Sequence, residues 1–342
     1  MKILYVGNAQ GFDNAAKYYL IPQKLINGFT RDGHNVYVFN DRDYARPSNV
    51  FHSSKFGIKA VNRKMIEICE GFSPDLIVLG HCKHITNDTL ATVRARLPAV
   101  KIIYRNVDPL HSPKNVADIR SRVGIVDGIF ITTAGKALKQ FAHEKTFVAY
   151  MPNPTDQSIE TGRAFEKGGD IDLFFAGSFL RDQHDHRNVM LRRLQSELSD
   201  MNVAFFGSGL GERKVFGQEY LDTLANSRMS LCLSKTSDYL FYSSDRMAQL
   251  LGQGSLVFID RGPRFDRLFG DDEMVFYDDL DDLIKKIRYF HEHDDERKAI
   301  AKKGWEKAHA IYDSMLVASF MVEKTFGLNF SHDYAWLGKD EE

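Results

Sequence analysis

The sequence predicts an α/β protein built from two doubly wound parallel sheets, each in its own domain. In the first half of the chain, apolar segments of strand length alternate with helix-sized segments. This alternation is typical of a parallel sheet with crossover helices. A stretch rich in Pro, Gly and polar residues, 151–169, interrupts the pattern and marks a domain boundary. After this stretch the same alternation starts again.

The first domain is predicted over residues 1–152. Strands are expected at short apolar segments: 3–7, 36–39, 76–79, 101–104, 128–132 and 146–150. Helices are expected between most of them, at 15–30, 59–70, 87–97 and 135–143. Because the carboxyl ends of parallel strands meet at one edge of a sheet, a ligand site is expected at that edge.

A linker is predicted over 153–169 and a second domain over 170–313. Its strands are expected at 171–176, 203–206, 229–233, 255–259 and 274–277. Its helices are expected at 186–199, 217–226, 244–252, 280–291 and 295–312. The remaining residues, 314–342, are predicted to contain a helix over 314–326 and a tail.

Composition narrows the class of protein. The chain has 342 residues, is 43% hydrophobic and carries a net charge of −1, so it is long enough for two domains and offers no bulk attraction to nucleic acid. Three cysteines lie far apart without a CxxC motif, which favours buried thiols in a reducing cytosol. No segment resembles a signal peptide or a membrane span. These features predict a cytoplasmic protein, with peripheral contact at the inner face of the membrane left open.

The stretch 227–261 contains a strand, a polar and aromatic loop, a short helix and another strand. Ser243 or Ser244 is expected to cap the helix, and glycines end it. At about 100° per residue, three polar side chains share one helix face, which is expected to be turned toward a ligand: Arg246, Gln249 and Gln253. The charge and the two amides suit an anionic ligand that carries hydroxyl groups, such as a nucleotide.

This stretch resembles the donor-binding segment of the GT-B glycosyltransferases, especially the CgeB-like branch of the group 1 type. In that family an R-x-x-E-x-x-x-x-G motif precedes a strand that ends in Asp. Here the motif reads R-M-A-Q-L-L-G-Q-G from Arg246 to Gly254, and the strand ends at Asp260. The family glutamate, which holds the ribose hydroxyls, is Gln249 in this chain. The resemblance implies the GT-B fold, with an acceptor domain followed by a nucleotide-sugar donor domain, and terminal helices that return to the first domain.

The resemblance also implies where the donor binds. The glycine turn after strand 171–176 faces the diphosphate, with backbone and hydroxyl donors from Gly177 and Ser178 and a charge from Arg181 or Arg187; solvated arginines at a helix start are the competing interpretation. The base is expected near Gly207 and Ser208. The predicted donor contacts further along the chain are Lys235, Tyr242, Ser244, Arg246 and Gln249.

Three residues of the first domain are candidates for a general base. An inverting transfer needs a group that deprotonates the acceptor hydroxyl, whereas a retaining transfer has no obvious base. His81 and Asp108 follow predicted strands, and Asp13 follows the turn from Gly7 to Gly11. A purely structural role is the competing interpretation for each of them.

No metal site is predicted. The histidines in 182–186 lack a third ligand, and the acidic runs at 271–273 and 278–282 are interpreted as helix starts. We therefore expect a metal-independent glycosyltransferase without a cofactor. Its expected donor is a UDP-, GDP- or dTDP-sugar, and its expected acceptor is a glycan, a lipid-linked molecule or a small molecule in bacterial surface glycan or glycoconjugate synthesis. The alternatives are a sugar-nucleotide epimerase of the same fold and a non-catalytic protein that binds nucleotide sugars.

Overall fold

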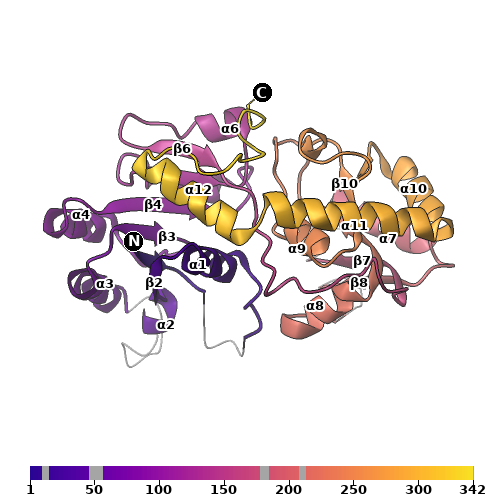
Figure 1. The fold of residues 1–342 in the computed structure, drawn as a ribbon, viewed down its shortest axis with the longest axis horizontal. Helices are drawn as coiled ribbons and strands as arrows, with labels where there is room; N and C mark the ends of the chain where they lie inside the picture. Colours follow the sequence, from indigo (N-terminus) through magenta and orange to yellow (C-terminus); the bar gives the residue numbers. More distant parts are fainter. Residues whose placement is uncertain (10–14, 46–56, 178–184, 208–212, 342) are drawn as a thin grey trace. The chain divides into compact units, whose positions relative to one another are not determined.

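The structure is a computed structural model that describes residues 1–9, 15–45, 57–177, 185–207 and 213–341 (Figure 1). The chain divides into two compact units. Unit 1 comprises Met1–Pro154 together with Ser314–Glu342, and unit 2 comprises Thr155–Asp313. Each unit contains a parallel sheet covered by helices, so the predicted α/β class is confirmed.

Among the described residues, the sheet of unit 1 has six strands, all paired in parallel. They are β1 (Lys2–Val6), β2 (Asn35–Phe39), β3 (Leu76–Leu79), β4 (Lys101–Asn106), β5 (Gly128–Ile131) and β6 (Phe147–Tyr150). Their spatial order is β2-β1-β3-β4-β5-β6. The chain therefore moves outward in opposite directions from β1 and β3, and such a reversal point is where doubly wound sheets bind ligands.

The helices of unit 1 differ more from the prediction than its strands do. They are α1 (Ile21–Arg31), α2 (Asp41–Ala45), α3 (Ile58–Phe72), α4 (Asn87–Arg96), α5 (Pro113–Arg120), α6 (Gly135–Lys139) and α12 (Ser314–Phe326). The helix predicted from residue 15 begins only at Ile21, because Pro22 occupies its first turn, where proline is favoured. The short helices α2 and α5 were not predicted, since neither is long enough to show a clear helical period.

Helix α12 belongs to unit 1 although it lies near the end of the chain, and Figure 1 shows it in yellow, crossing in front of the strands of that unit. It packs closely against α1. A Cβ atom on Gly28 of α1 would lie 2.1 Å from the carbonyl oxygen of Ser314, and the Arg31 Nη1 donates to the Ser314 Oγ at 3.2 Å. The ring of Phe320 also meets that of Phe130 in β5, with centroids 6.0 Å apart.

Unit 2 repeats the architecture with a five-stranded parallel sheet among its described residues. Its strands are β7 (Ile171–Ala176), β8 (Val203–Phe206), β9 (Ser227–Cys232), β10 (Leu256–Asp260) and β11 (Val275–Tyr277), in the order β11-β10-β9-β7-β8. Its helices are α7 (His186–Glu197), α8 (Gly217–Ala225), α9 (Arg246–Gly252), α10 (Leu280–Glu292) and α11 (Asp294–Ile311), with a 3₁₀ turn, η1, at Phe265–Arg267. Here the reversal point lies between β7 and β9.

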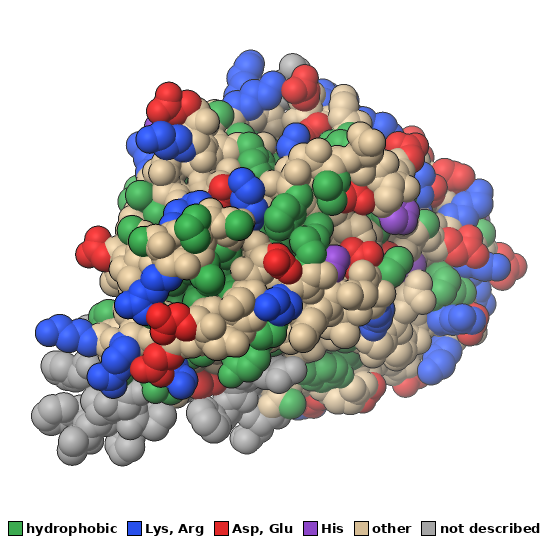
Figure 2. Space-filling view, turned by 60° about the vertical axis from the view of Figure 1, so that its left-hand side comes forward, with side chains coloured by type: hydrophobic (Ala, Val, Ile, Leu, Met, Phe, Trp, Pro, Cys, Tyr) green, Lys and Arg blue, Asp and Glu red, His purple; other side chains and the backbone are tan. Residues whose placement is uncertain are grey.

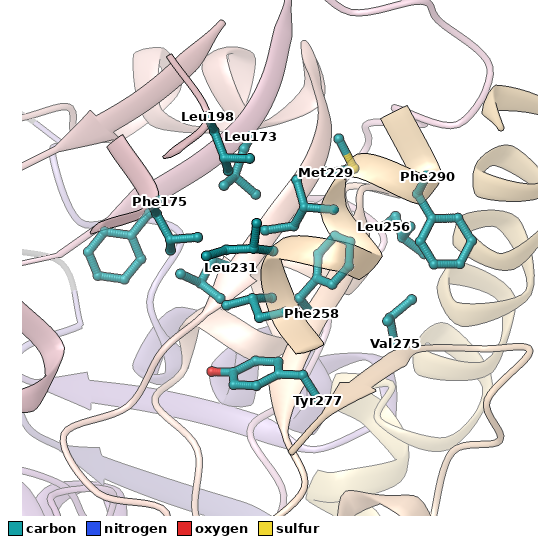
Figure 3. Packing of buried hydrophobic residues seen from close by; sticks show 14 of the residues in the cluster. Leu173, Phe175, Leu198, Met229, Leu231, Leu256, Phe258, Val275, Tyr277 and Phe290 are labelled. Atoms are coloured by element: carbon teal, nitrogen blue, oxygen red, sulfur yellow. The ribbon is translucent and has the colours of Figure 1, made fainter. Parts of the chain in front are cut away.

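The core of unit 2 fills the space between its sheet and helices (Figure 3). Leu173, Met229, Leu231 and Leu256 come from adjacent strands and have no exposed surface. The strand sequences are nearly continuous apolar runs because helices cover both faces of a parallel sheet.

The stretch predicted as a linker is largely part of unit 2. The boundary between the units falls at Pro154. Beyond it, Phe165 joins the hydrophobic core, the Gly162 N–H donates to the Gln253 Oε1 at 2.6 Å, and the Ala164 N–H donates to the Gln253 carbonyl at 2.9 Å. Proline and glycine mark irregular backbone, but they do not reveal whether that backbone is solvated or packed.

Charges of both signs are mixed on the face that Figure 2 presents, where Lys and Arg side chains stand among Asp and Glu side chains. This distribution agrees with the net charge of −1. No helix in the described part of the chain combines the length and apolar character needed to cross a membrane.

Candidate functional site

Two glycines lie at the carboxyl end of the unit 2 sheet. Gly177 follows β7 and Gly207 follows β8, the neighbouring strand. Gly207 has φ +136°, and a Cβ atom there would lie 1.7 Å from the Gly177 carbonyl oxygen. Only glycine fits this conformation and this close approach, so the two turns lie against each other.

Two arginines converge on the same strand end. The Arg246 guanidinium lies 4.8 Å from the ring centroid of Phe175, and the Arg187 guanidinium lies 6.0 Å from it. Figure 3 shows Phe175 at the margin of the hydrophobic cluster. A Cβ atom on Gly177 would come within 3.0 Å of the Arg246 Nη2, so the glycine leaves space for this guanidinium. Arg187 and Arg246 are called the arginine pair below.

The arginine pair concentrates positive charge in a sheltered place. Arg187 is 5% exposed, and its burial, together with the charge of Arg246, lowers its pKa to about 10, so Arg187 is still charged at neutral pH. The Arg246 Nη1 donates to the Leu233 carbonyl at 3.0 Å, but no carboxylate of the described residues forms an ion pair with Arg246. Two like charges held together favour a bound anion.

The other predicted donor residues surround this place in different ways. Tyr242 is buried, and its hydroxyl acts electrostatically on Arg187. The Ser244 N–H donates to the Ser234 Oγ at 3.3 Å, while the Ser244 hydroxyl is buried and has no hydrogen-bond partner among the described residues. Lys235, just after β9, is exposed. Ser178, Arg181 and Ser208 lie outside the described residues, as does Asp13 of the first domain.

Of the three polar side chains predicted to share an accessible face of α9, only Arg246 is partly exposed. Gln249 is 3% exposed; its Oε1 accepts from the Tyr220 hydroxyl at 2.8 Å, and its Nε2 donates to the Asp245 Oδ2 at 3.2 Å. Gln253 is equally buried and accepts from the Gly162 N–H. The expected exposure of both amides is therefore wrong. Helical periodicity shows which face of a helix is polar. It does not show whether that face is exposed to solvent or buried against hydrogen-bond partners from other parts of the protein.

In unit 1 the structure brings together two of the predicted catalytic candidates. His81 follows β3 and Asp108 follows β4, and these strands are neighbours in the sheet. The His81 Nδ1 lies 3.9 Å from the Asp108 Oδ2, with side chains 28% and 52% exposed. Both side chains are therefore accessible at the carboxyl edge of the sheet, close to its reversal point.

The charges around His81 keep its imidazole neutral. Burial lowers its pKa most, the positive charge of Arg105 lowers it further, and Arg42 and Lys83 add to this effect; Asp108 opposes it. The resulting pKa is about 4. A neutral imidazole has a free lone pair at pH 7, so it can accept a hydrogen bond or a proton, although so low a pKa makes it a weak base.

Sequence reasoning missed two features of the same edge. Arg105 lies inside β4, is 1% exposed, and donates from Nε to the Tyr5 hydroxyl at 2.8 Å. A charged residue within an apolar strand was the sequence feature that could have indicated it. His84 and Asp41 form a second pair, with 2.7 Å between Nδ1 and Oδ2. No sequence pattern linked those two residues, because they meet only where the start of α2 packs against the turn after β3.

A cavity of about 130 Å³ opens beside this edge, lined by His81, Cys82, Lys83, Tyr104, Asp118, Ser121 and Arg122. Its volume is below the several hundred Å³ typical of whole-ligand pockets. It therefore suits one small group of a ligand rather than a nucleotide.

No cluster of three or more His, Cys, Asp or Glu side chains suited to a metal occurs among the described residues. Of the two acidic runs interpreted as helix starts, only 278–282 begins a helix, α10; the interpretation is wrong for 271–273, which precedes β11. Both runs have structural partners. Asp279 caps α10 by accepting from the Asp282 N–H at 2.8 Å, and Asp272 pairs with Lys303 at 2.9 Å.

Comparisons with known proteins agree with this architecture. Residues 185–323 match the model of a family described as glycosyl transferase-like. The fold is similar to that of Anabaena Alr3699/HepE, solved in complex with UDP and glucose, with a TM-score of 0.60, 14% sequence identity, and coverage of 96% of this chain and 100% of that one. No curated protein matches the sequence.

Two further structures have the same fold. Sucrose-phosphate synthase from Thermosynechococcus elongatus has a TM-score of 0.58 at 11% identity, with 95% of this chain and 98% of that one covered. A Listeria monocytogenes protein provisionally named a UDP-N-acetylglucosamine 2-epimerase has a TM-score of 0.53 at 10% identity, with 98% and 99% covered. The fold is that of the GT-B glycosyltransferases, with two Rossmann-like units.

Proposed function

We propose that this protein is a glycosyltransferase that moves a sugar from a nucleotide-activated donor to an acceptor hydroxyl. The arginine pair beside Gly177 carries the proposal, because a partly buried, doubly charged site at a reversal point suits a diphosphate. The match to a glycosyl transferase-like family over 185–323 supports it. Since HepE was solved with UDP and with UDP-glucose, UDP-sugars are the first donors to test, ahead of GDP- and dTDP-sugars.

The arginine pair would act on the leaving group. As the bond between the sugar and the diphosphate breaks, negative charge develops on the diphosphate. Two guanidinium groups held at fixed positions stabilise that charge without reorganising. A divalent cation is then unnecessary, so we infer a metal-independent reaction. Gly177, Gly207, Lys235 and Ser244 border the same strand ends and complete the donor site.

Unit 1 would bind the acceptor, with His81 and Asp108 as its reactive groups. The neutral imidazole of His81 can accept the hydroxyl proton, and the Asp108 carboxylate, 3.9 Å away, would stabilise the imidazolium that forms. In a retaining reaction the same imidazole would hold the hydroxyl by a hydrogen bond.

The finer assignment follows the sequence resemblance. We infer a member of the CgeB-like branch that works in bacterial surface glycan or glycoconjugate synthesis. An epimerase acting on a nucleotide sugar is the second candidate, because the Listeria protein shares the fold over nearly all of both chains. A non-catalytic binding protein is less well supported, because the departure at Gln249 that favoured it has a structural explanation in Tyr220 and Asp245.

Calorimetry on the full chain tests the donor site. UDP, GDP and dTDP should be titrated into the wild type, into Arg246→Gln and into Arg288→Gln. Arg288 makes an exposed ion pair with Asp200 on the same unit, so it is a matched control. We expect Arg246→Gln to weaken binding at least about tenfold, the effect of one charge-assisted hydrogen bond, while the control binds normally. Equal affinity in both folded variants would refute the assignment of Arg246.

Turnover separates the candidate activities. Sugar transfer or donor hydrolysis supports the transferase, an isomerised donor supports the epimerase, and binding without turnover supports a non-enzymatic role. The transferase should remain active after exhaustive treatment with EDTA. Loss of activity that Mg²⁺ or Mn²⁺ restores would contradict metal independence.

A further inference from the structure

Arg105 of unit 1 holds a buried positive charge beside the candidate acceptor site. Its side chain is 1% exposed and lies over Gly80, where a Cβ atom would come within 3.3 Å of the Arg105 Nη2 and 3.2 Å of the Tyr5 hydroxyl. The glycine that precedes His81 therefore makes room for the guanidinium. Arg105 donates from Nε to the Tyr5 hydroxyl and lies 5.8 Å from the ring centroid of Tyr5.

This charge is not neutralised within the described part of the chain. The Arg105 Nη1 is buried and has no hydrogen-bond partner, and no described carboxylate forms an ion pair with Arg105. Burial raises the pKa of the Tyr5 hydroxyl in spite of Arg105, so Tyr5 stays neutral and brings no negative charge to offset that of Arg105. An arginine cannot lose its proton to escape burial, and a buried unpaired charge is costly.

The surroundings add further positive charge. Arg42 and Lys83 act on His81 with the same sign as Arg105, and Asp108 acts with the opposite sign. Lys83 is paired with Asp118 at 3.0 Å, whereas no ion pair of Arg42 is found among the described residues. The net potential next to His81 is therefore positive although the chain as a whole carries a charge of −1.

We propose that unit 1 binds an anionic group, a carboxylate or a phosphate, on Arg105 next to His81, and that the acceptor is therefore an acid. The unpaired guanidinium supplies two parallel N–H donors of the kind that carboxylates and phosphates accept. The role of the anion as part of the acceptor rests on the proposed transferase function. The donor diphosphate belongs to the arginine pair of unit 2, so the two anionic groups of the reaction have separate sites.

The NMR signals of the His81 imidazole can be used to detect an anion bound at Arg105. Inorganic phosphate and acetate should be titrated into the full chain while the ring signals of His81 are followed by NMR, with His81→Gln identifying them. We expect a saturable shift and a rise in the pKa of His81, because a bound anion offsets the charge of Arg105. In Arg105→Gln the affinity should fall at least about tenfold. Arg63→Gln, an exposed position on α3, should respond like the wild type.

Arg105→Lys is the second variant and keeps the positive charge. It should retain a weakened response, because a lysine lacks the planar fork of the guanidinium. Thermal melting shows which variants are folded. Absence of a saturable response in the wild type, or an undiminished response in folded Arg105→Gln, would overturn the proposal.

A competition arm identifies which substrate supplies the anion. If saturating UDP leaves the phosphate response of His81 intact, the site is free for the acceptor. If UDP abolishes that response, the donor fills the site and the proposal of an acidic acceptor is wrong. A His81 response without any binding of UDP, GDP or dTDP would instead refute the transferase and support the anion site alone. Binding of UDP that depends on Arg246, without a His81 response, would support the transferase and refute the anion site on Arg105.

Discussion

Arg246 and Gln249 lie three residues apart on α9, yet they have different surroundings. Arg246 stacks on Phe175 beside Gly177, whereas Gln249 is enclosed by Tyr220 and Asp245. One helical turn therefore separates a candidate ligand contact from a structural amide. The family motif draws attention to both positions, but only the packing of α8 distinguishes them.

Gln249→Ala should lower the free energy of unfolding by about 1–3 kcal/mol, because it removes the acceptor of the Tyr220 hydroxyl and the donor to Asp245. Gln249→Glu should cost more, since it places a carboxylate against the Asp245 carboxylate. Tyr220→Phe should cost about 0.5–1.5 kcal/mol. Urea denaturation measures all three. If Gln249→Ala keeps full stability and loses donor affinity, the amide serves the ligand and this interpretation fails.

His81 should make the protein less stable in mild acid. Its pKa is about 4 in the folded protein, below the ordinary value of 6.5, so between these pH values the unfolded chain binds a proton that the folded chain does not. Stability is unaffected above pH 6.5 and falls as the pH drops toward 4, by up to about 3 kcal/mol. In His81→Gln this contribution should be absent. If the free energies of unfolding of the wild type and of His81→Gln change with pH in the same way between pH 4 and 6.5, the low pKa of His81 is contradicted.

At the scale of elements, strands were predicted better than helices. Each predicted strand of unit 1 is present, with ends that differ by at most two residues, because buried parallel strands are short apolar runs. Helix starts depend on local details such as Pro22 in α1. The closest helix contact, between α1 and α12, joins segments almost 300 residues apart, and no local pattern indicated it.

Two helical glycines of unit 1 should respond oppositely to alanine. Gly28→Ala should destabilise the protein by about 1–3 kcal/mol, the range for overpacking, because the new methyl group would meet the Ser314 carbonyl at 2.1 Å. Gly71→Ala on α3 meets nothing within 4 Å and should stabilise by up to about 1 kcal/mol through helix propensity. Thermal or urea unfolding compares them. Equal effects at both sites would mean that α1 and α12 do not approach this closely.

At the scale of the whole molecule, unit 1 is assembled from both ends of the chain. Its C-terminal part, Ser314–Glu342, contributes fully buried side chains such as Val317, Met321 and Trp336. The residues of unit 2 must therefore be synthesised before the C-terminal part of the chain can cover the hydrophobic surface of unit 1.

Ending the chain at Asp313 should leave unit 1 unable to fold stably, because each large apolar side chain lost from a core removes about 1.5–3 kcal/mol. We expect aggregation or a lost cooperative transition, measured by circular dichroism and size-exclusion chromatography. Removing only the last two residues is the control, since Glu341 makes an exposed ion pair with Lys139, and such pairs contribute little. A fully folded, monodisperse protein ending at Asp313 would contradict the structure.

The amino-acid sequence was enough to predict the fold class and the strands, because parallel sheets and their crossover helices have a local pattern of apolar segments. It was also enough to reveal the GT-B resemblance. It also indicated the strand ends where Arg246, His81 and Asp108 lie. The tertiary structure was needed to show which polar side chains have hydrogen-bond partners within the protein and which do not. Gln249 and Gln253 are hydrogen-bonded to partners from distant segments, while the Nη1 of Arg105, within an apolar strand, has no hydrogen-bond partner among the described residues. The reason is physical: periodicity records which face of an element is polar, whereas the balance of buried charge depends on neighbours that the fold brings from elsewhere in the chain.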